Sequence, residues 1–134
     1  MTLVLPNQCP PAASFTTSGV YYRLGEGTLQ PGDSPGPSSW LKPCETRSGK
    51  YYKQFEACDA YGLSMFASLS DLNHARDLNP LMARKSVAEF RIEQDQGRVV
   101  HSPSADGESH HDWWSSPLEF SPSAIIIESK RELL

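Results

Sequence analysis

The segment Ser86–Ile92 (SVAEFRI) indicates the fold class, because its side chains alternate between two faces of an extended chain. One face is wholly apolar and the other is mixed: Ala88, Phe90 and Ile92 against Val87, Glu89 and Arg91. A side-chain period of two is that of a β-strand. The segment therefore predicts a half-buried strand.

The chain after this strand predicts a β-hairpin. Asp95-Gln96-Gly97 has the residue types of a tight turn. Arg98–His101 (RVVH) follows at once and contains two β-branched residues. We therefore expect Arg98–His101 to pair with Ser86–Ile92.

Three further segments predict short strands. Val20–Leu24 (VYYRL) combines β-branched and aromatic residues between two glycines. Leu63–Phe66 is short and mostly apolar, and Ala124–Glu128 is an apolar run that ends in a carboxylate. These segments supply the remaining strands of the predicted sheet.

Two helices are expected. In Lys50–Tyr61, three residues fall on one face at helical spacing: Tyr51, Phe55 and Cys58. A second helix begins after an N-cap at Ser68 or Ser70 and runs to Asn79, where Pro80 ends it. Its predicted inward face consists of Leu69, Leu72, Ala75 and Leu78.

Proline and glycine mark two irregular stretches. Residues 1–17 predict an extended, loosely held arm, with three prolines in the first eleven positions. Gly25–Ser39 predicts a long loop, because proline and glycine at this density cannot continue a helix or a central strand. Trp40 and Leu41 are expected to anchor the far end of this loop in the core.

Together these segments predict an α+β fold. The arm, residues 1–17, precedes a single compact domain over residues 18–134, and the length of 134 residues suits one core. We expect a mainly antiparallel, twisted sheet with two or so short helices and a long Pro/Gly-rich loop.

Composition argues against several classes of function. Twelve basic and sixteen acidic residues give a net charge of −4, so no nucleic-acid partner is expected. The longest aliphatic run, Ala124–Ile127, is too short to span a bilayer, so no membrane partner is expected. Met1–Leu5 lacks a basic lead and a long apolar segment, so we expect no signal peptide and a cytoplasmic location.

Cysteine usage agrees with that location. Cys9, Cys44 and Cys58 form an odd set with no Cys-x-x-Cys pair, which argues against structural zinc or a thioredoxin-like centre. We therefore expect three reduced thiols.

The cluster His110-His111-Asp112 can support acid–base chemistry or metal binding. On an extended chain His110 and Asp112 share one side while His111 faces away. A third metal ligand would have to be His101 or Asp106, at no recognised spacing, so we expect no metal.

Trp113 and Trp114 follow this cluster and allow three interpretations. They can plug the core or shield a sheet edge. They can stack on the flat ring of a ligand, with a histidine donating hydrogen bonds. They can also anchor a protein–protein interface, in which Trp is a frequent hot-spot residue.

Arg23 is the second functional candidate, at the end of a strand beside two tyrosines. A guanidinium there can clamp a phosphate or pyrophosphate through two parallel hydrogen bonds. The alternative is an ordinary exposed arginine paired with Glu26 or Glu89.

The order of several segments carries a resemblance. Ser18–Arg23 (SGVYYR) leads to Leu29–Asp33 (LQPGD), and Ser64–Asp71 (SMFASLSD) follows as a strand entering a helix. Phe90–Ile92 and Ile125–Glu128 complete the order. This succession resembles the small bacterial ADP-ribosyltransferases of the rifampicin-modifying type, with their Ser-Gly-x-Tyr strand and Leu-x-x-Gly-Asp turn.

The resemblance implies a set of site residues and NAD as the substrate. Where that family has a histidine, this chain has Arg23, and a branch of the wider superfamily uses Arg, Ser and Glu on three successive motifs. Arg23, Ser64 and Glu128 match that branch. By resemblance, Arg23 holds the phosphate or ribose, the Ser64 strand shapes the nicotinamide pocket, and Glu128 binds a ribose hydroxyl and stabilises the oxocarbenium-like state.

Further roles follow from this resemblance. Tyr22, Trp113 or Trp114 would stack on the nicotinamide ring, and His110 or His111 would activate the acceptor. The first function considered is therefore an NAD-dependent ADP-ribosyltransferase-like toxin or modifying enzyme. The alternative is a non-catalytic protein-binding module, such as an antitoxin, immunity or accessory factor, that uses a Trp113–Trp114 surface. A His/Asp metal hydrolase is a third option.

Overall fold

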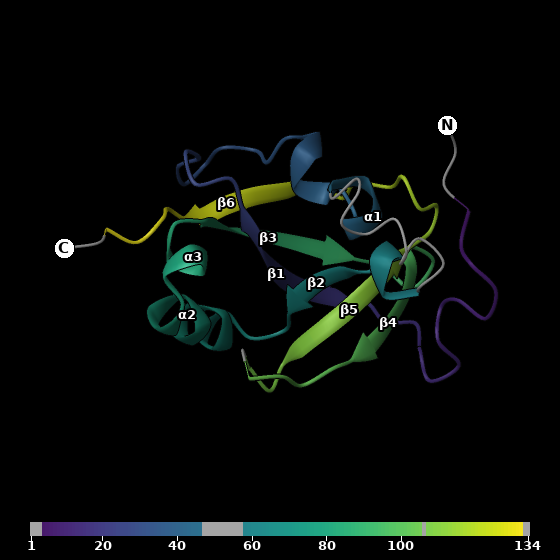
Figure 1. The fold of residues 1–134 in the computed structure, drawn as a ribbon. Coiled ribbons are helices and arrows are strands. Elements are labelled where there is room, and N and C mark those ends of the chain that lie inside the picture. The colour runs from purple at the N-terminus through teal and green to yellow at the C-terminus, as the bar shows by residue number, and fades with distance from the viewer. Residues whose placement is uncertain (1–3, 47–57, 106, 133–134) are drawn as a thin grey trace.

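The protein folds around one six-stranded antiparallel sheet of order β4-β5-β2-β1-β3-β6 (Figure 1). The computed structural model describes residues 4–46, 58–105 and 107–132. The strands are β1 (Gly19–Gly25), β2 (Leu63–Phe66), β3 (Ser86–Ile92), β4 (Gly97–His101), β5 (His110–Ser115) and β6 (Ala124–Glu128). The short helices are α1 (Pro43–Thr46), α2 (Leu69–Leu78) and α3 (Pro80–Ala83), with 3₁₀ turns η1 (Pro37–Trp40) and η3 (Cys58–Tyr61). The predicted α+β fold with a mainly antiparallel sheet is confirmed.

Helix α2 begins where its cap predicts. The Ser68 hydroxyl accepts a hydrogen bond from the Asp71 N–H, which satisfies one of the free donors of the first turn. Leu72 and Ala75 are buried as expected. Leu78 is not part of the inward face, because 68% of its surface is exposed at the end of the helix.

The predicted hairpin between Ser86–Ile92 and Arg98–His101 is wrong. Strand β3 already has two neighbours, since it pairs with β1 along seven residues and with β6 on its other edge. Strand β4, which follows the turn, pairs with β5 instead. Gly97 makes this possible: its φ is +129°, and a Cβ there would lie 2.2 Å from the Trp114 carbonyl oxygen.

Apolar side chains cover both faces of the sheet. On one face Phe66, Leu72 and Val87 are buried, with α2 and α3 packed beside them. The opposite face holds the larger cluster: Tyr21, Trp40, Leu63, Met65, Phe90, Ile92, Val99 and Trp113. Because the sheet is covered on both sides, few of its side chains are free to act on a ligand.

The Pro/Gly-rich loop is attached to the sheet edge. Gly32 N–H donates to the Ile126 carbonyl, and Ile126 N–H donates to the Asp33 carbonyl, each at 2.9 Å. Trp40 anchors the end of the loop as predicted, at 6% exposure, but Leu41 is 40% exposed and does not. The helix expected over Lys50–Tyr61 falls mostly outside the described residues, of which Cys58–Tyr61 forms η3.

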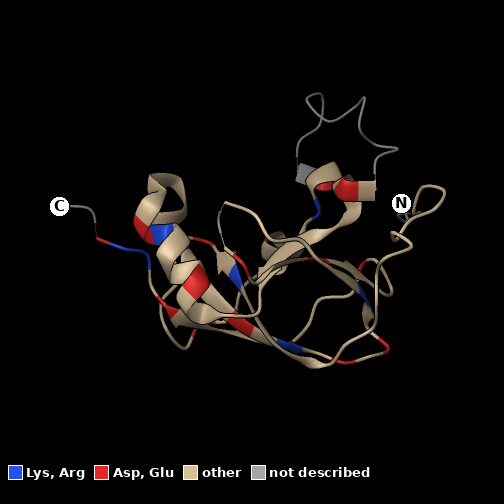
Figure 2. Ribbon diagram, turned by 90° about the horizontal axis from the view of Figure 1, so that it is seen from below, with Lys and Arg blue, Asp and Glu red and all other residues tan. Residues whose placement is uncertain are grey.

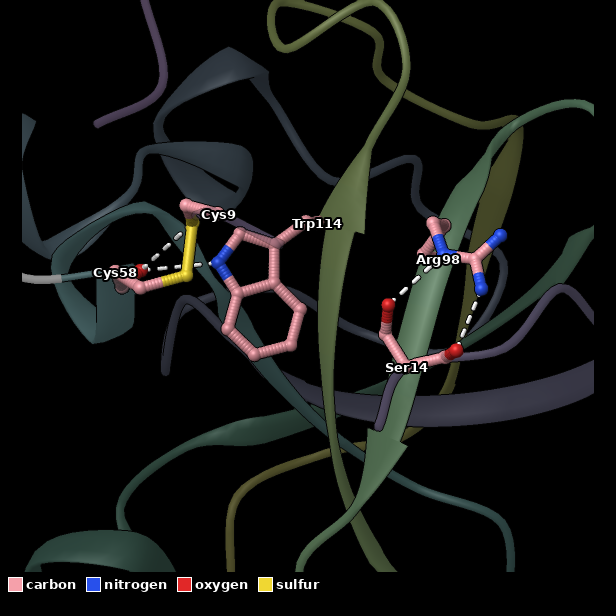
Figure 3. The surroundings of a disulfide bond; sticks show 5 residues. All are labelled: Cys9, Ser14, Cys58, Arg98 and Trp114. Carbon is pink, nitrogen blue, oxygen red and sulfur yellow. Dashed lines mark hydrogen bonds between the residues drawn. A yellow bond between two sulfur atoms is a disulfide. The ribbon is translucent and has the colours of Figure 1, made fainter. Parts of the chain in front are cut away.

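The N-terminal arm is held to the domain by a covalent bond and by hydrogen bonds (Figure 3). Cys9 forms a disulfide with Cys58, so the expectation of three reduced thiols is wrong. The Arg98 guanidinium donates to the Ser14 hydroxyl and carbonyl, and Phe15 forms a β-bridge with Val99. Spacing cannot reveal this pair, because the two cysteines meet only when the arm crosses the domain.

The helices of the described residues are all too short or too polar to cross a membrane.

Loss of the disulfide should destabilise the fold. The bond links residues 49 positions apart, and closing a loop of that length stabilises a protein by about 4 kcal/mol in chain-entropy terms. We expect the double variant Cys9→Ser/Cys58→Ser to melt roughly 10 °C below the wild type. Reductant should lower the melting temperature of the wild type and leave that of the variant unchanged. An equal effect of reductant on both proteins would contradict the assignment.

Candidate functional site

The sheet splits between β1 and β2, and a pocket lies at the split. Strand β1 pairs with β3 at seven positions but with β2 at one only, Tyr22 opposite Phe66. β4 and β5 run at a steep angle to β3 and β6 (Figure 1). The pocket has a volume of about 270 Å³ and is lined by Arg23, Leu24, Ser64, Phe66, Met82 and His110.

Arg23 bridges the split with its guanidinium group. One terminal nitrogen donates to the Ser64 carbonyl on β2 and the other to the Ser39 carbonyl in η1, while its Nε has no hydrogen-bond partner among the described residues. The guanidinium carbon lies 5.6 Å from the centre of the Trp40 ring, within the range of a cation–π interaction.

The charge of Arg23 is not balanced by a carboxylate of the described residues. No carboxylate among residues 4–46, 58–105 and 107–132 forms an ion pair with it. Burial lowers the pKa of Arg23 to about 10, because the charged form is removed from water. The predicted pairing with Glu26 or Glu89 is therefore wrong: Glu26 accepts a hydrogen bond from Ser38, and Glu89 lies beside Tyr22.

Ser64 and His110 face each other across the pocket wall. The Ser64 hydroxyl oxygen lies 3.1 Å from Nε2 of His110, on the neighbouring strand β5. The imidazole also contacts the Phe66 ring edge-on, at 5.2 Å between ring centres. The pocket thus combines a cation, a hydroxyl and an imidazole.

The two histidines of β5 point to opposite faces, as the alternation predicts. The His110 Nδ1 and Asp112 both form hydrogen bonds with Ser102. His111 lies on the other face, with ring contacts to Tyr21 at 5.6 Å and His101 at 4.9 Å. Burial is the main reason that the pKa of His111 is lowered.

The tryptophans of β5 belong to the core. Trp113 is 0% and Trp114 2% exposed. Their indole N–H groups donate to the main-chain carbonyls of Gln96 and Cys58, at 3.0 and 2.9 Å. The expectation of a Trp113–Trp114 interface surface, or of either ring as a stacking platform, is therefore wrong, and the core interpretation holds.

Tyr22 does not line the pocket either. It packs at the margin of the cluster under α2, and its pKa is raised by burial first and by the neighbouring Glu89 second. The rings that do line the pocket are Phe66 and His110. Phe66 follows Ser64 on the same face of β2, a signal that sequence inspection missed.

Glu128 does not join Arg23 and Ser64. Its carboxylate accepts hydrogen bonds from Asn73 at 2.9 Å and from the fully buried Arg76 at 3.2 Å, which ties β6 to α2. The third polar side chain of the pocket is His110. The Arg–Ser–Glu set implied by the resemblance is therefore assembled only in its first two members.

Lys and Arg are scattered among Asp and Glu over the described residues and form no basic stripe (Figure 2). Within that part of the chain, no group of three or more His, Cys, Asp or Glu is placed to hold a metal. Asp106, named as a possible ligand, lies outside the described residues.

Replacing Glu128 should destabilise the fold and spare the pocket. Glu128→Ala leaves the buried Arg76 without its carboxylate, which lowers the free energy of unfolding by about 3 kcal/mol. The matched control is Glu93→Ala, whose pair with Arg91 is exposed on both sides and contributes less than about 1 kcal/mol. Urea unfolding measures both. A smaller loss for Glu128→Ala than for Glu93→Ala would contradict the assignment.

His111 should make stability depend on pH. Its pKa is lowered in the folded state, so the unfolded chain binds the proton more readily, and stability falls as the pH drops below about 6.5. The pKa of Asp71 is lowered mainly by its hydrogen bond with Ser109, so this residue reduces stability only when the pH falls below its ordinary pKa of 3.8. We expect the loss of unfolding free energy between pH 7.5 and pH 5 to be smaller in His111→Gln than in the wild type. Equal losses in the two proteins would show that His111 is not the source of the pH dependence.

Comparisons with known proteins add no relative. No protein-family description, curated protein or solved structure matches the chain.

Proposed function

We propose that this protein binds NAD at the pocket between β1 and β2, in the manner of an ADP-ribosyltransferase-like domain. The observation that carries the proposal is the guanidinium of Arg23 at the wall of a pocket, a partly buried cation that no carboxylate of the described part of the chain pairs with. A buried charge costs free energy unless it is paired, so an anion that binds beside the guanidinium would stabilise it. The pyrophosphate of NAD supplies such an anion.

The resemblance gives independent support for NAD. It selected Arg23 and Ser64, which lie 41 positions apart in sequence, and both residues line the same pocket. Phe66 and Leu24 add an apolar wall suited to a flat ring. A volume of about 270 Å³ is below that of most sites for whole ligands, so the pocket would enclose one end of NAD.

The position of Glu128 limits the proposal to binding. In the branch that the chain resembles, a glutamate stabilises the oxocarbenium-like state, whereas here Glu128 is engaged by Arg76. His110 occupies the third position on the pocket wall. ADP-ribosyl transfer would therefore have to proceed with an imidazole where that branch has a carboxylate.

Calorimetric titration with NAD tests the proposal. We expect saturable binding that Arg23→Gln weakens at least tenfold, because a hydrogen bond to a charged group contributes about 1.5–3 kcal/mol. Arg91→Gln is the matched control, since Arg91 lies on the sheet but is exposed and is not among the residues that line the pocket. Circular dichroism of each variant confirms that it is folded.

Two outcomes would overturn the proposal. The absence of binding at millimolar NAD would exclude NAD as the ligand. Equal weakening by Arg23→Gln and Arg91→Gln would show that the site lies elsewhere.

A further inference from the structure

Ser64 and His110 form the first pair of a longer chain of hydrogen bonds. The Ser64 hydroxyl lies 3.1 Å from His110 Nε2, and both side chains line the pocket. Ser64 is an exposed residue, whereas its neighbours Leu63 and Met65 are buried on the opposite face. The hydroxyl is therefore open to a molecule in the pocket.

The hydrogen bonds on the far side of the ring determine its tautomer. His110 Nδ1 lies 3.0 Å from the Ser102 main-chain carbonyl oxygen, which can only accept. Nδ1 therefore carries the hydrogen. In the neutral ring Nε2 then presents a lone pair, and the Ser64 hydroxyl donates to it.

The carboxylate of Asp112 is linked to His110 through the Ser102 side chain. The Ser102 hydroxyl donates to Asp112 at 2.9 Å, and its oxygen lies 3.0 Å from His110 Nδ1, from which it accepts. The Ser102 N–H also donates to the His110 carbonyl at 2.9 Å, which fixes the two strands at this point. Positive charge that develops on His110 is thus stabilised through Ser102 by Asp112.

We propose that Ser64 is a nucleophile activated by His110, with Ser102 and Asp112 as positioning residues, and that the pocket cleaves carboxylic esters bearing an anionic group. A hydroxyl, a base in the correct tautomer and a group that orients the base are the parts that nucleophilic catalysis by serine requires. Arg23, beside the Ser64 main chain, selects substrates with a carboxylate or phosphate. This activity needs no NAD.

The reaction balances with these groups alone. The Ser64 oxygen attacks the ester carbonyl carbon while its proton passes to His110 Nε2. The carbon–oxygen bond to the alcohol then breaks, and His110 returns the proton to the departing oxygen. Water repeats the two steps on the acyl-serine, which releases the carboxylic acid and restores Ser64 and His110.

Labelling with an alkyl fluorophosphonate tests the nucleophile directly. An activated serine displaces fluoride and retains the phosphonyl group, which intact-mass and peptide mass spectrometry locate. We expect one adduct per chain, on Ser64, and none in Ser64→Ala. His110→Gln should label at least about 100-fold more slowly, since a general base contributes about 10²–10⁴ in rate.

His111→Gln is the matched control, because this neighbouring histidine faces the opposite side of the sheet. It should label at the wild-type rate. Asp112→Asn should label more slowly and alter the pH profile, which a merely structural role would not do.

A second measurement tests the substrate class. The wild type should hydrolyse a 4-nitrophenyl ester with a free carboxylate at least tenfold faster than its neutral analogue, and Arg23→Gln should remove this preference. The absence of an adduct, an adduct on another residue, or labelling that His110→Gln leaves unchanged would overturn the nucleophile. Equal hydrolysis of the two esters would overturn the anionic class.

Discussion

The hydrogen bonds of Arg23 across the split between β1 and β2 are the interaction on which the site depends. These strands share one residue pair, so the main-chain ladder that joins the rest of the sheet is nearly absent here. Arg23 replaces part of it by donating to the Ser64 carbonyl on β2, and a second bond, to the Ser39 carbonyl, ties the guanidinium to η1. The same contacts place a positive charge at the pocket wall, because both acceptors are neutral.

Burial of the aromatic residues explains why so few groups remain available for function. The face of the sheet that points away from α2 and α3 is filled by rings from distant segments, among them Trp40, Phe90 and Trp113. Aromatic side chains bury a large area and stabilise the core strongly. Trp113 belongs to this cluster and Trp114 is buried as well, while His110 and Asp112 share a face with Ser64.

The adjacent residues His110 and His111 have different environments because they point to opposite faces of β5. His110 is oriented by Ser102 at the pocket, whereas His111 is half-buried beside Tyr21 and His101. Alternation along β5 accounts for the difference without any further assumption. Arg23, Ser64 and His110 line the same pocket, so a ligand held by Arg23 would lie within reach of the Ser64 hydroxyl.

The sequence alone determined the local structure, because alternation, capping and punctuation are local properties. It predicted five strands, the cap of α2 and the opposed sides of His110 and His111. It could not predict which strands pair. The residues of β3 fit a hairpin partner as well as they fit the two distant strands, β1 and β6, with which β3 pairs. Only the tertiary structure joined Cys9 to Cys58, assigned Glu128 to Arg76 and brought Ser102 behind His110. Each of these contacts except the last links residues about fifty positions apart, and the energy that selects them comes from packing the whole chain.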